Sequence, residues 1–356
     1  MHICTVGLGN IGFNLYKFLL EKFPGEVTGV DVNKQIVQKL QELGYNVTSD
    51  YQTLTNIDTW LLAPSTGNQG QNLFAALDAM LIKPESLISI ESTLPPGTME
   101  RIRGYLEERG FSLGLDLFVI HVPHRVMFGV DRTICDTPRV MGAFTKACLE
   151  KGRQFYEGLV PGLIEVLDVR IAELSKVVEN VKRYVDIAFA EEIYRYCAKS
   201  GIDFQNLRLA VNSKENVELL TTDWGIGGEC LPKDMGFLRA VLSSSLLDGA
   251  EQSDREYREE IIHRVGSRRR VLVKGLSYKP GVKDLKHSRA MDLVRLLQEH
   301  GTMVTVEDPL FTSEELVAEG LQPFVSDDET NELLDDISNE DLPVIVLERD
   351  RALEPK

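Results

Sequence analysis

The segment Ile3-Cys4-Thr5-Val6-Gly7-Leu8-Gly9-Asn10-Ile11-Gly12 decides the fold of this chain. Its first four residues have the pattern of a buried strand, and a helical pattern follows from Phe13 to Phe23. Glycines between a strand and a helix permit a tight turn and close approach of the backbone, so that a pyrophosphate can lie at the helix N-terminus. Asp31 ends the next apolar run, nineteen residues beyond Gly12. This spacing predicts a dinucleotide-binding turn, whereas a merely structural glycine turn is the alternative.

The residue at position 31 also predicts which dinucleotide binds. A carboxylate there can accept hydrogen bonds from both hydroxyls of the adenosine ribose and would repel a 2'-phosphate. We therefore expect NAD rather than NADP. The expected cofactor-binding residues are Gly7, Gly9, Asn10, Ile11, Gly12 and Asp31.

The order of apolar and amphipathic stretches gives the architecture. Strand-like runs alternate with helical stretches, which is typical of a parallel sheet covered by helices. The helical period then dominates from Val169 to Ala198 without Gly or Pro, longer than an ordinary globular helix. We predict an α/β chain with two Rossmann-like doubly wound domains joined by a central helical domain with one long helix. The expected domains are 1–165 for NAD, 166–262 for dimerisation and catalysis, and 263–356 for the nucleotide of the substrate. The expected strands are 3–6, 27–30, 60–63, 87–90, 117–120, 271–275, 303–307 and 344–347.

Composition excludes several classes of protein. A length of 356 residues suits two or three domains, and no apolar run approaches the roughly 20 residues that span a bilayer. The formal net charge of -16 disfavours a nucleic-acid partner. Five scattered cysteines without a CxxC pair predict neither a disulfide framework nor a zinc site. The first strand begins at His2-Ile3, so we expect no secretory leader. The scattered cysteines favour a reducing cytoplasm, and we expect no metal.

A second motif, Gly225-Ile226-Gly227-Gly228-Glu229-Cys230-Leu231-Pro232-Lys233-Asp234, carries the chemistry. Clustered glycines let the backbone crowd a ligand, and Pro232 suits the first turn of a helix. Cys230 would then lie near the positive end of that helix, where a thiolate is stabilised and nucleophilic at neutral pH. A buried structural cysteine is the alternative.

Five segments, in order, resemble the UDP-glucose/GDP-mannose dehydrogenase family, whose nucleophile lies in a GGxCxPKD-type segment. The resemblance implies an N-terminal NAD domain, a central dimerising helix and a C-terminal domain that holds the nucleotide of a nucleotide-sugar. The segments are 7–12, Ser92-Thr93-Leu94-Pro95-Pro96-Gly97-Thr98, Glu173-Leu174-Ser175-Lys176 with Asn180, 225–234, and Gly275-Leu276-Ser277-Tyr278-Lys279-Pro280-Gly281.

The resemblance also assigns roles. Cys230 is the nucleophile, Lys176 supports the alkoxide or thiohemiacetal oxygen with help from Asn180, Asp234 orients or activates the hydrolytic water, and Thr93 assists that water. Lys176 and Asn180 are four residues apart, so they share one helix face that could stabilise an oxyanion. The expected substrate-binding residues are Arg125, Gly227, Gly228 and Lys279.

Other positions depart from the family and bear on the sugar. Pro123-His124-Arg125-Val126-Met127-Phe128-Gly129 resembles the PERVxPG segment of the UDP-N-acetylhexosamine branch, but His124 replaces its Glu. The Pro232-Lys233-Asp234 run is more typical of the glucose and mannose branch. In Asp284-Leu285-Lys286-His287-Ser288-Arg289, Lys286 and Arg289 replace the Arg and Pro of a DxRxSP segment. His124 could alter the network that activates water or could have only a surface or packing role, and both interpretations stay open. Taken together, these segments favour UDP-N-acetylmannosamine as the substrate.

The resemblance implies a four-electron oxidation of the sugar C6 alcohol to a carboxylate, through a thiohemiacetal and a thioester on Cys230. UDP-glucose and GDP-mannose are the alternative substrates. Two other classes stay open, namely a two-electron hydroxyacid-type dehydrogenase and a non-catalytic nucleotide-sugar binding protein. The expected partners are a UDP-sugar and a second copy of the chain, and the expected role is in polysaccharide biosynthesis.

Overall fold

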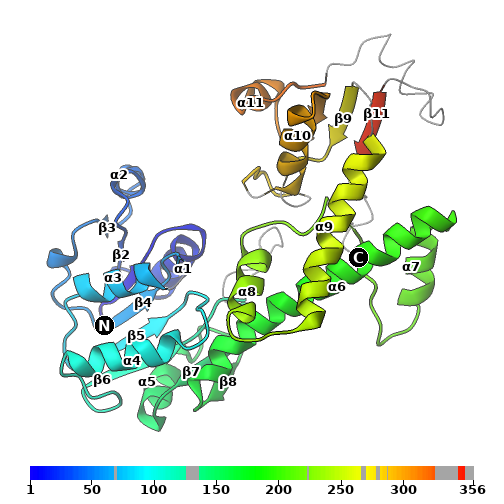
Figure 1. The fold of residues 1–356 in the computed structure, drawn as a ribbon. Helices are drawn as coiled ribbons and strands as arrows, with labels where there is room; N and C mark the ends of the chain where they lie inside the picture. The colour runs from blue at the N-terminus through cyan, green and yellow to red at the C-terminus, as the bar shows by residue number, and fades with distance from the viewer. Residues whose placement is uncertain are drawn as a thin grey trace. The chain divides into compact units, whose positions relative to one another are not determined.

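The computed structural model describes residues 1–67, 70–125, 136–222, 224–265, 270–277, 281–286, 288–324 and 344–348. The chain divides into two compact units, Met1–Glu179 and Asn180–Lys356, and the boundary falls inside one long helix. Figure 1 shows the elements of each unit.

The first unit is built on a sheet that has eight strands among the described residues, in the order β3-β2-β1-β4-β5-β6-β7-β8. Neighbouring strands pair parallel except β6 and β7, which pair antiparallel. The strand order reverses between β1 and β4, and open α/β sheets bind ligands at the carboxyl ends of the strands at such a point. The strands are β1 (Ile3–Val6), β2 (Val27–Val30), β3 (Val47–Thr48), β4 (Thr59–Leu62), β5 (Ser86–Ile90), β6 (Leu117–His121), β7 (Arg139–Ala143) and β8 (Leu163–Val166).

Two hydrophobic cores cover the two faces of this sheet, because successive residues of a strand point to opposite sides. Leu61 belongs to the core that also holds side chains of α1, α2 and α5, whereas its neighbours Trp60 and Leu62 belong to the core with α3 and α4. Buried on both faces, these strands are near-continuous apolar runs, as parallel strands usually are. The helical segments are α1 (Asn10–Lys22), α2 (Lys34–Glu42), η1 (Tyr51–Thr53), α3 (Gln71–Ala79), α4 (Thr98–Glu108) and α5 (Lys146–Tyr156).

Helix α6 (Val169–Ser200) is 32 residues long and continues from the first unit into the second. In the second unit it is joined to α9 (Ser245–Val265) by a hydrogen bond from Ser253 to the Ala188 carbonyl and by ion pairs of Arg195 with Glu256 and Glu260. Two shorter helices, α7 (Phe204–Asn212) and α8 (Cys230–Arg239), belong to the same unit.

The C-terminal part of the second unit has three parallel strands among the described residues, in the order β10-β9-β11. Its core contains Val273 and Val306 from the sheet and Val294 from α10, and Trp224 and Tyr257 from the helical region pack into it. The elements are β9 (Arg270–Lys274), α10 (Arg289–Glu299), β10 (Met303–Glu307), α11 (Ser313–Ala318) and β11 (Val344–Glu348).

The structure confirms the predicted fold class, including the long helix, which runs two residues beyond the predicted end. The predicted parallel sheet has one antiparallel pair, since β7 runs antiparallel to β6. The sequence analysis also missed β3, β7 and β8. The three domain boundaries stay a prediction. No helix of the described residues is long and apolar enough to cross a membrane.

Candidate active site

The glycine turn after β1 has the geometry that a bound pyrophosphate requires. Gly7 has a φ of +84°, and a Cβ on it would lie 2.7 Å from the Pro64 Cα. A Cβ on Gly12 would lie 1.7 Å from the Gly7 carbonyl oxygen, so both glycines are needed for packing. By contrast, a Cβ on Gly9 would meet no atom of the described residues within 4 Å. Gly9 therefore leaves open space at the N-terminus of α1, whose first turn has no capping side chain among the described residues.

Asp31 follows β2, next to this turn. Its Oδ2 accepts a hydrogen bond from the Leu8 N–H at 2.6 Å, and its Oδ1 accepts one from the Asn33 N–H at 2.8 Å. The side chain is partly exposed, so each oxygen keeps room for a further donor. Gly7 to Gly12 together with Asp31 thus fit the pyrophosphate and ribose of a dinucleotide.

The N-terminal part of α6 fixes two loops of the first unit. Glu173 is 1% exposed and accepts hydrogen bonds from the N–H groups of Gly97, at 3.0 Å, and Met99, at 2.7 Å. It thereby holds the end of the loop that carries Thr93. Glu179 pairs with Arg125, with 2.8 Å between Oε1 and Nη2. Lys176 lies on the helix between these two anchors and is partly buried.

A buried polar network lies where β5 and β6 end and β7 begins. Glu91, at 1% exposure, accepts hydrogen bonds from Ser89 at 2.6 Å, from Tyr156, and from Arg139 at 2.8 Å. The Nε2 of His124 lies 2.9 Å from the same carboxylate. Burial alone would raise the pKa of Glu91, but Arg139 and His124 hold it well below its usual range. The Glu91 carboxylate is therefore ionised, and the buried guanidinium of Arg139 balances its charge.

This network explains the state of the two histidines beside it. Burial, and after it the charge of Arg139, lowers the pKa of His124 to about 4. Burial likewise lowers the pKa of His121 to about 4. Both imidazoles are neutral at pH 7. His124 thus packs against the carboxylate of Glu91, which the sequence analysis did not single out.

In the second unit, Cys230 is the first residue of α8 and is exposed to solvent. The prediction that Pro232 lies in the first turn of a helix, with Cys230 at its N-terminal end, is confirmed. The preceding Gly228 has a φ of +82°, which shapes the turn of Gly227 and Gly228. A thiolate at this end of a helix is stabilised by the backbone dipoles.

Asp234 is fully buried one turn into α8. The Asn180 Nδ2 donates a hydrogen bond to its Oδ2 at 2.5 Å, and the Lys233 Nζ lies 3.6 Å from its Oδ1. The structure therefore brings Asn180 and Asp234 together although they are 54 residues apart. Lys176 precedes Asn180 by one turn of α6, as predicted.

Several predicted positions lie outside the described residues. These are Lys279 of the substrate set and Val126 to Gly129 of the segment on which the choice of sugar partly rests. Among the described residues, no group of three or more His, Cys, Asp or Glu side chains is arranged to hold a metal ion.

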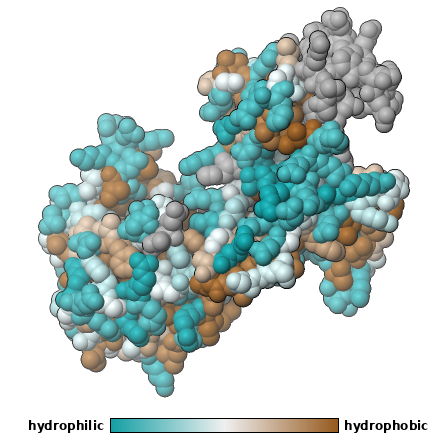
Figure 2. Space-filling view, viewed as in Figure 1, coloured by the Kyte–Doolittle hydropathy of each residue, from teal (hydrophilic) through white to brown (hydrophobic). Residues whose placement is uncertain are grey.

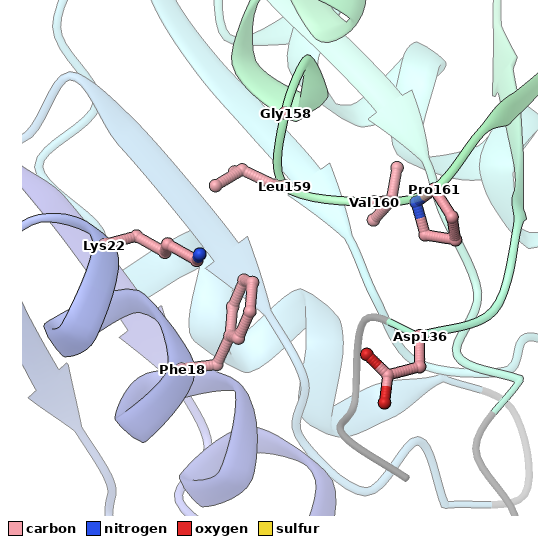
Figure 3. A pocket seen from close by; sticks show the side chains of 7 residues that line it. All are labelled: Phe18, Lys22, Asp136, Gly158, Leu159, Val160 and Pro161. Carbon is pink, nitrogen blue, oxygen red and sulfur yellow. The ribbon is translucent and has the colours of Figure 1, made fainter.

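A separate hollow of the first unit, about 370 Å³ in volume, lies at the other end of α1 from the glycine turn (Figure 3). Phe18 and Lys22 line it from that helix, and Gly158 to Pro161 line it from a loop. It is open to solvent and contains none of the predicted site residues.

The sequence analysis missed Glu91, Arg139, Tyr156 and Glu179, and it gave Glu173 no role. Only Glu173 carried a usable signal, because it opens the segment that contains Lys176 and stands one helical turn before it. The other four were missed because each is defined by contacts with residues far along the chain.

The glycine turn with its acidic partner is typical of α/β proteins that bind a dinucleotide, and the second unit adds an exposed cysteine at a helix N-terminus. Comparison with known proteins narrows this class. Residues 170–251 match the central domain of the UDP-glucose/GDP-mannose dehydrogenase family, and residues 272–351 match the UDP binding domain of that family. The chain belongs to this family and is an oxidoreductase of the nucleotide-sugar dehydrogenase class.

Individual relatives agree with this assignment. The UDP-N-acetyl-D-mannosamine dehydrogenase of Campylobacter jejuni is 27% identical over 86% of each chain. The NDP-N-acetyl-D-galactosaminuronic acid dehydrogenase of Ralstonia solanacearum is 29% identical over 86% of this chain and 82% of that protein. A structure of the UDP-N-acetyl-mannosamine dehydrogenase of S. aureus superimposes with a TM-score of 0.74 at 26% identity, over 88% of this chain and 84% of that one.

Proposed function

We propose that this chain is a cytoplasmic, NAD-dependent dehydrogenase that oxidises the C6 alcohol of UDP-N-acetyl-D-mannosamine to the carboxylate, for polysaccharide biosynthesis. The observation that carries the proposal is the position of Cys230, exposed at the first residue of α8 behind a glycine turn. The names of the relatives support an N-acetylated sugar, and UDP-glucose and GDP-mannose are the alternatives that an assay must separate.

NAD is the proposed hydride acceptor, because the residues around Gly9 fit a dinucleotide. The open space at Gly9 admits the pyrophosphate against the N-terminus of α1. Asp31, already oriented by Leu8 and Asn33, would accept from the ribose hydroxyls and repel a 2'-phosphate. When bound, NAD would supply a nicotinamide carbon that accepts one hydride, so the two oxidation steps consume two NAD molecules in succession.

Before each hydride leaves, negative charge develops on an oxygen atom of the substrate, first on the alkoxide of the alcohol and then on the oxyanion of the thiohemiacetal. In the first step the alcohol loses a hydride and a proton and becomes an aldehyde. The Cys230 thiolate then adds to the aldehyde carbon to form a thiohemiacetal, whose carbon can give up a second hydride. We assign stabilisation of these oxygens to the ammonium group of Lys176, assisted by the amide of Asn180.

The thioester that results is released by water. Water adds to the carbonyl carbon and the carbon–sulfur bond breaks, so that the uronate leaves, Cys230 is again a thiolate, and the two protons of the water are released. We assign orientation of this water to Asp234, held by Asn180, with help from Thr93. Arg125, Gly227, Gly228 and Lys279 are the proposed contacts of the substrate, and the match of residues 272–351 to a UDP binding domain supports a uridine nucleotide.

Helix α6 supports the proposal of a homodimer. It exposes a row of large apolar side chains at roughly heptad spacing. They are Ile171, Leu174, Val178, Phe189 and Tyr196, which are 36% to 61% exposed. Figure 2 shows hydrophobic patches, in brown, on a surface that is mainly hydrophilic. A second copy of the helix is the proposed partner of this row, and sedimentation showing only monomer at micromolar concentration would exclude it.

The electron count tests the covalent scheme. With each of several UDP- and GDP-sugars, the number of NADH formed per sugar consumed is measured by absorbance, and the product is identified by mass spectrometry. Two NADH and one uronic acid, without free aldehyde, are expected for the true substrate. One NADH per sugar would favour a two-electron dehydrogenase, and none with any sugar would favour a binding protein.

Replacing Cys230 tests the nucleophile. Cys230→Ala should lower acid formation by a factor on the order of 10³ or more, because the aldehyde is no longer held covalently. NAD binding, followed by fluorescence titration, should be unchanged, since Cys230 is far along the chain from the glycine turn and lies in the other unit. A Cys230→Ala protein that still makes acid at near the original rate would refute the covalent step.

A further inference from the structure

The segment before the nucleophile is held at three points within the second unit. The indole N–H of Trp224 donates a hydrogen bond to the Gly275 carbonyl at 3.1 Å. The N–H of Ile226 donates to Oδ1 of Asp254 at 2.7 Å, and its carbonyl accepts from Nε of Arg289. Ile226 is 1% exposed, and charged side chains thus satisfy both of its backbone polar groups. It is a fixed point four residues before Cys230.

The anchor on the N–H side is rigid. Asp254 lies on α9, is 2% exposed, and pairs through its Oδ2 with Nη2 of Arg258 at 3.1 Å. Gly225 has a φ of +101°, and a Cβ on it would come within 2.7 Å of the Arg258 Cδ. Helix α9 therefore fixes both the backbone shape and the hydrogen bond at this side of Ile226.

The anchor on the carbonyl side is Arg289, the first residue of α10. Its guanidinium donates through Nε to Ile226 and through Nη1 to Asp292 at 3.0 Å, and the side chain is 24% exposed. Two directed hydrogen bonds fix the plane of a guanidinium group. The family segment that this part of the chain resembles has proline at this position, and a proline side chain has no donor. Arg289 therefore supplies a donor that the proline of that segment would not.

We propose that Arg289 is a positioning residue for the reaction at Cys230. By holding the Ile226 carbonyl, it fixes the start of the turn that Gly227 and Gly228 form and so limits the positions of the thiol at the N-terminus of α8. Two successive glycines have wide conformational freedom, so an anchor at one end of the turn restricts the nucleophile at the other end. The inference rests on the proposed function in taking Cys230 as the reacting group.

The test compares variants on one helix. Arg289→Ala removes the donor, Arg289→Lys and Arg289→Gln retain a donor without the guanidinium plane, and Arg289→Pro introduces the family residue. Arg295→Ala is the matched control, because Arg295 also lies on α10, is 67% exposed, and pairs only at 3.8 Å with Asp292. For each full-length variant, the alkylation rate of Cys230 by iodoacetamide is measured by mass spectrometry, together with kcat, KM for NAD and the thermal unfolding midpoint.

Arg289→Ala should lower kcat about tenfold, because a displaced reacting group loses its aligned geometry. The alkylation rate should change severalfold, and KM for NAD should be unchanged. Arg289→Lys and Arg289→Gln should recover part of both losses, and Arg295→Ala should match the parent protein. A kcat and alkylation rate at parent values in Arg289→Ala would overturn the proposal, as would equal losses in Arg295→Ala.

Two further outcomes are distinguishable. If Arg289→Ala unfolds, Arg289→Met decides, because it removes the donor but keeps a long side chain, and an alkylation rate at the parent value in that variant counts against positioning. If no sugar is oxidised by the parent protein, the proposed function fails. The alkylation contrast between Arg289→Ala and Arg295→Ala still tests the role of Arg289, because it needs no substrate.

Discussion

Two turns of this molecule use the same backbone device, one in each unit. In the first unit, Gly7 ends β1 with a φ of +84° and donates its N–H to the Val30 carbonyl at 2.8 Å. The next N–H, of Leu8, donates to Oδ2 of Asp31 at 2.6 Å. The carboxylate after the neighbouring strand thus orients the turn.

In the second unit, Gly275 ends β9 with the same φ of +84° and donates to the Glu307 carbonyl at 2.9 Å. The N–H of Leu276 donates to Oδ2 of Asp308 at 2.7 Å. Here the N–H and the hydroxyl of Ser277 also donate to that oxygen, at 2.8 and 2.7 Å.

The difference lies in what remains available to a ligand. Gly9, two residues after the first glycine, leaves open space and Asp31 is partly exposed, whereas Ser277 fills the corresponding position and Asp308 is 6% exposed. A carboxylate that already accepts several internal hydrogen bonds has little capacity left for ribose hydroxyls. The first turn keeps acceptors that a dinucleotide could use, whereas in the second turn Asp308 accepts hydrogen bonds from the turn itself.

The largest effect expected from this comparison is on stability. Asp308→Ala leaves the N–H groups of Leu276 and Ser277 and the Ser277 hydroxyl without their acceptor in a buried place. We expect a loss of roughly 3–9 kcal/mol in the free energy of unfolding, at about 1–3 kcal/mol for each of these three buried unsatisfied groups. Urea denaturation of the full chain measures it. Asp31→Ala is the control and should lose much less, because water can reach its donors; equal losses would show that the two turns do not differ.

The next largest effect is that acid should destabilise the first unit more than the second. His121 and His124 of the first unit have their pKa lowered to about 4, whereas His263 and His300 of the second are exposed. In the unfolded chain, the imidazoles of His121 and His124 take up protons below about pH 6.5. In the folded first unit, they stay neutral until about pH 4. The contribution of these two histidines to the free energy of unfolding is therefore fully present above about pH 6.5 and is lost as the pH drops toward 4.

Between pH 7 and 5 the loss should be on the order of 2 kcal/mol for each of the two buried histidines. Hydrogen exchange with mass spectrometry, read separately for peptides of the two units, measures it. His124→Gln should remove about half of the pH dependence in the first unit. A first unit that is no more sensitive to acid than the second would contradict the assignment of neutral buried histidines.

The parts of the fold that were predictable depend on neighbours in sequence. The strand, the glycines and the helix of residues 3–22 form one local signal, and the four-residue spacing of Lys176 and Asn180 needs only the helical period. The antiparallel β7 was missed because nothing local to Arg139–Ala143 gives the direction or the partner of a strand. The pairing of a strand depends on long-range contacts, which a single sequence does not display.

The same distinction applies to the site. The network of Glu91 joins it to Arg139 and Tyr156, which are 48 and 65 residues away, so no local pattern pointed to any of them. The contact of Asn180 with Asp234 spans 54 residues, and only the family resemblance placed both at one site. The role of Ser277 was likewise hidden, because Gly275-Leu276-Ser277 resembles a nucleotide-binding loop until its bond to Asp308 is seen.

The cofactor preference tests the open turn. Asp31→Asn keeps an acceptor for the Leu8 N–H but removes the charge that repels a 2'-phosphate. The ratio of kcat/KM for NAD over NADP should fall about tenfold, close to 1.4 kcal/mol, and most of the change should lie in KM. Asp308→Asn is the matched control in the second turn and should leave this ratio unchanged. A parent protein that uses NADP as well as NAD would exclude this role for Asp31.

The smallest effect isolates the hydroxyl group that closes the second turn. Ser277→Ala removes one hydrogen bond to Asp308 but keeps those from the N–H groups of Leu276 and Ser277. The expected loss in the free energy of unfolding is about 1 kcal/mol, typical of one intramolecular hydrogen bond. The KM for NAD should not move, because this turn is proposed to hold no dinucleotide. If Ser277→Ala instead weakened NAD binding while stability stayed constant, the second turn would be a cofactor site, and the contrast between the two carboxylates would be wrong.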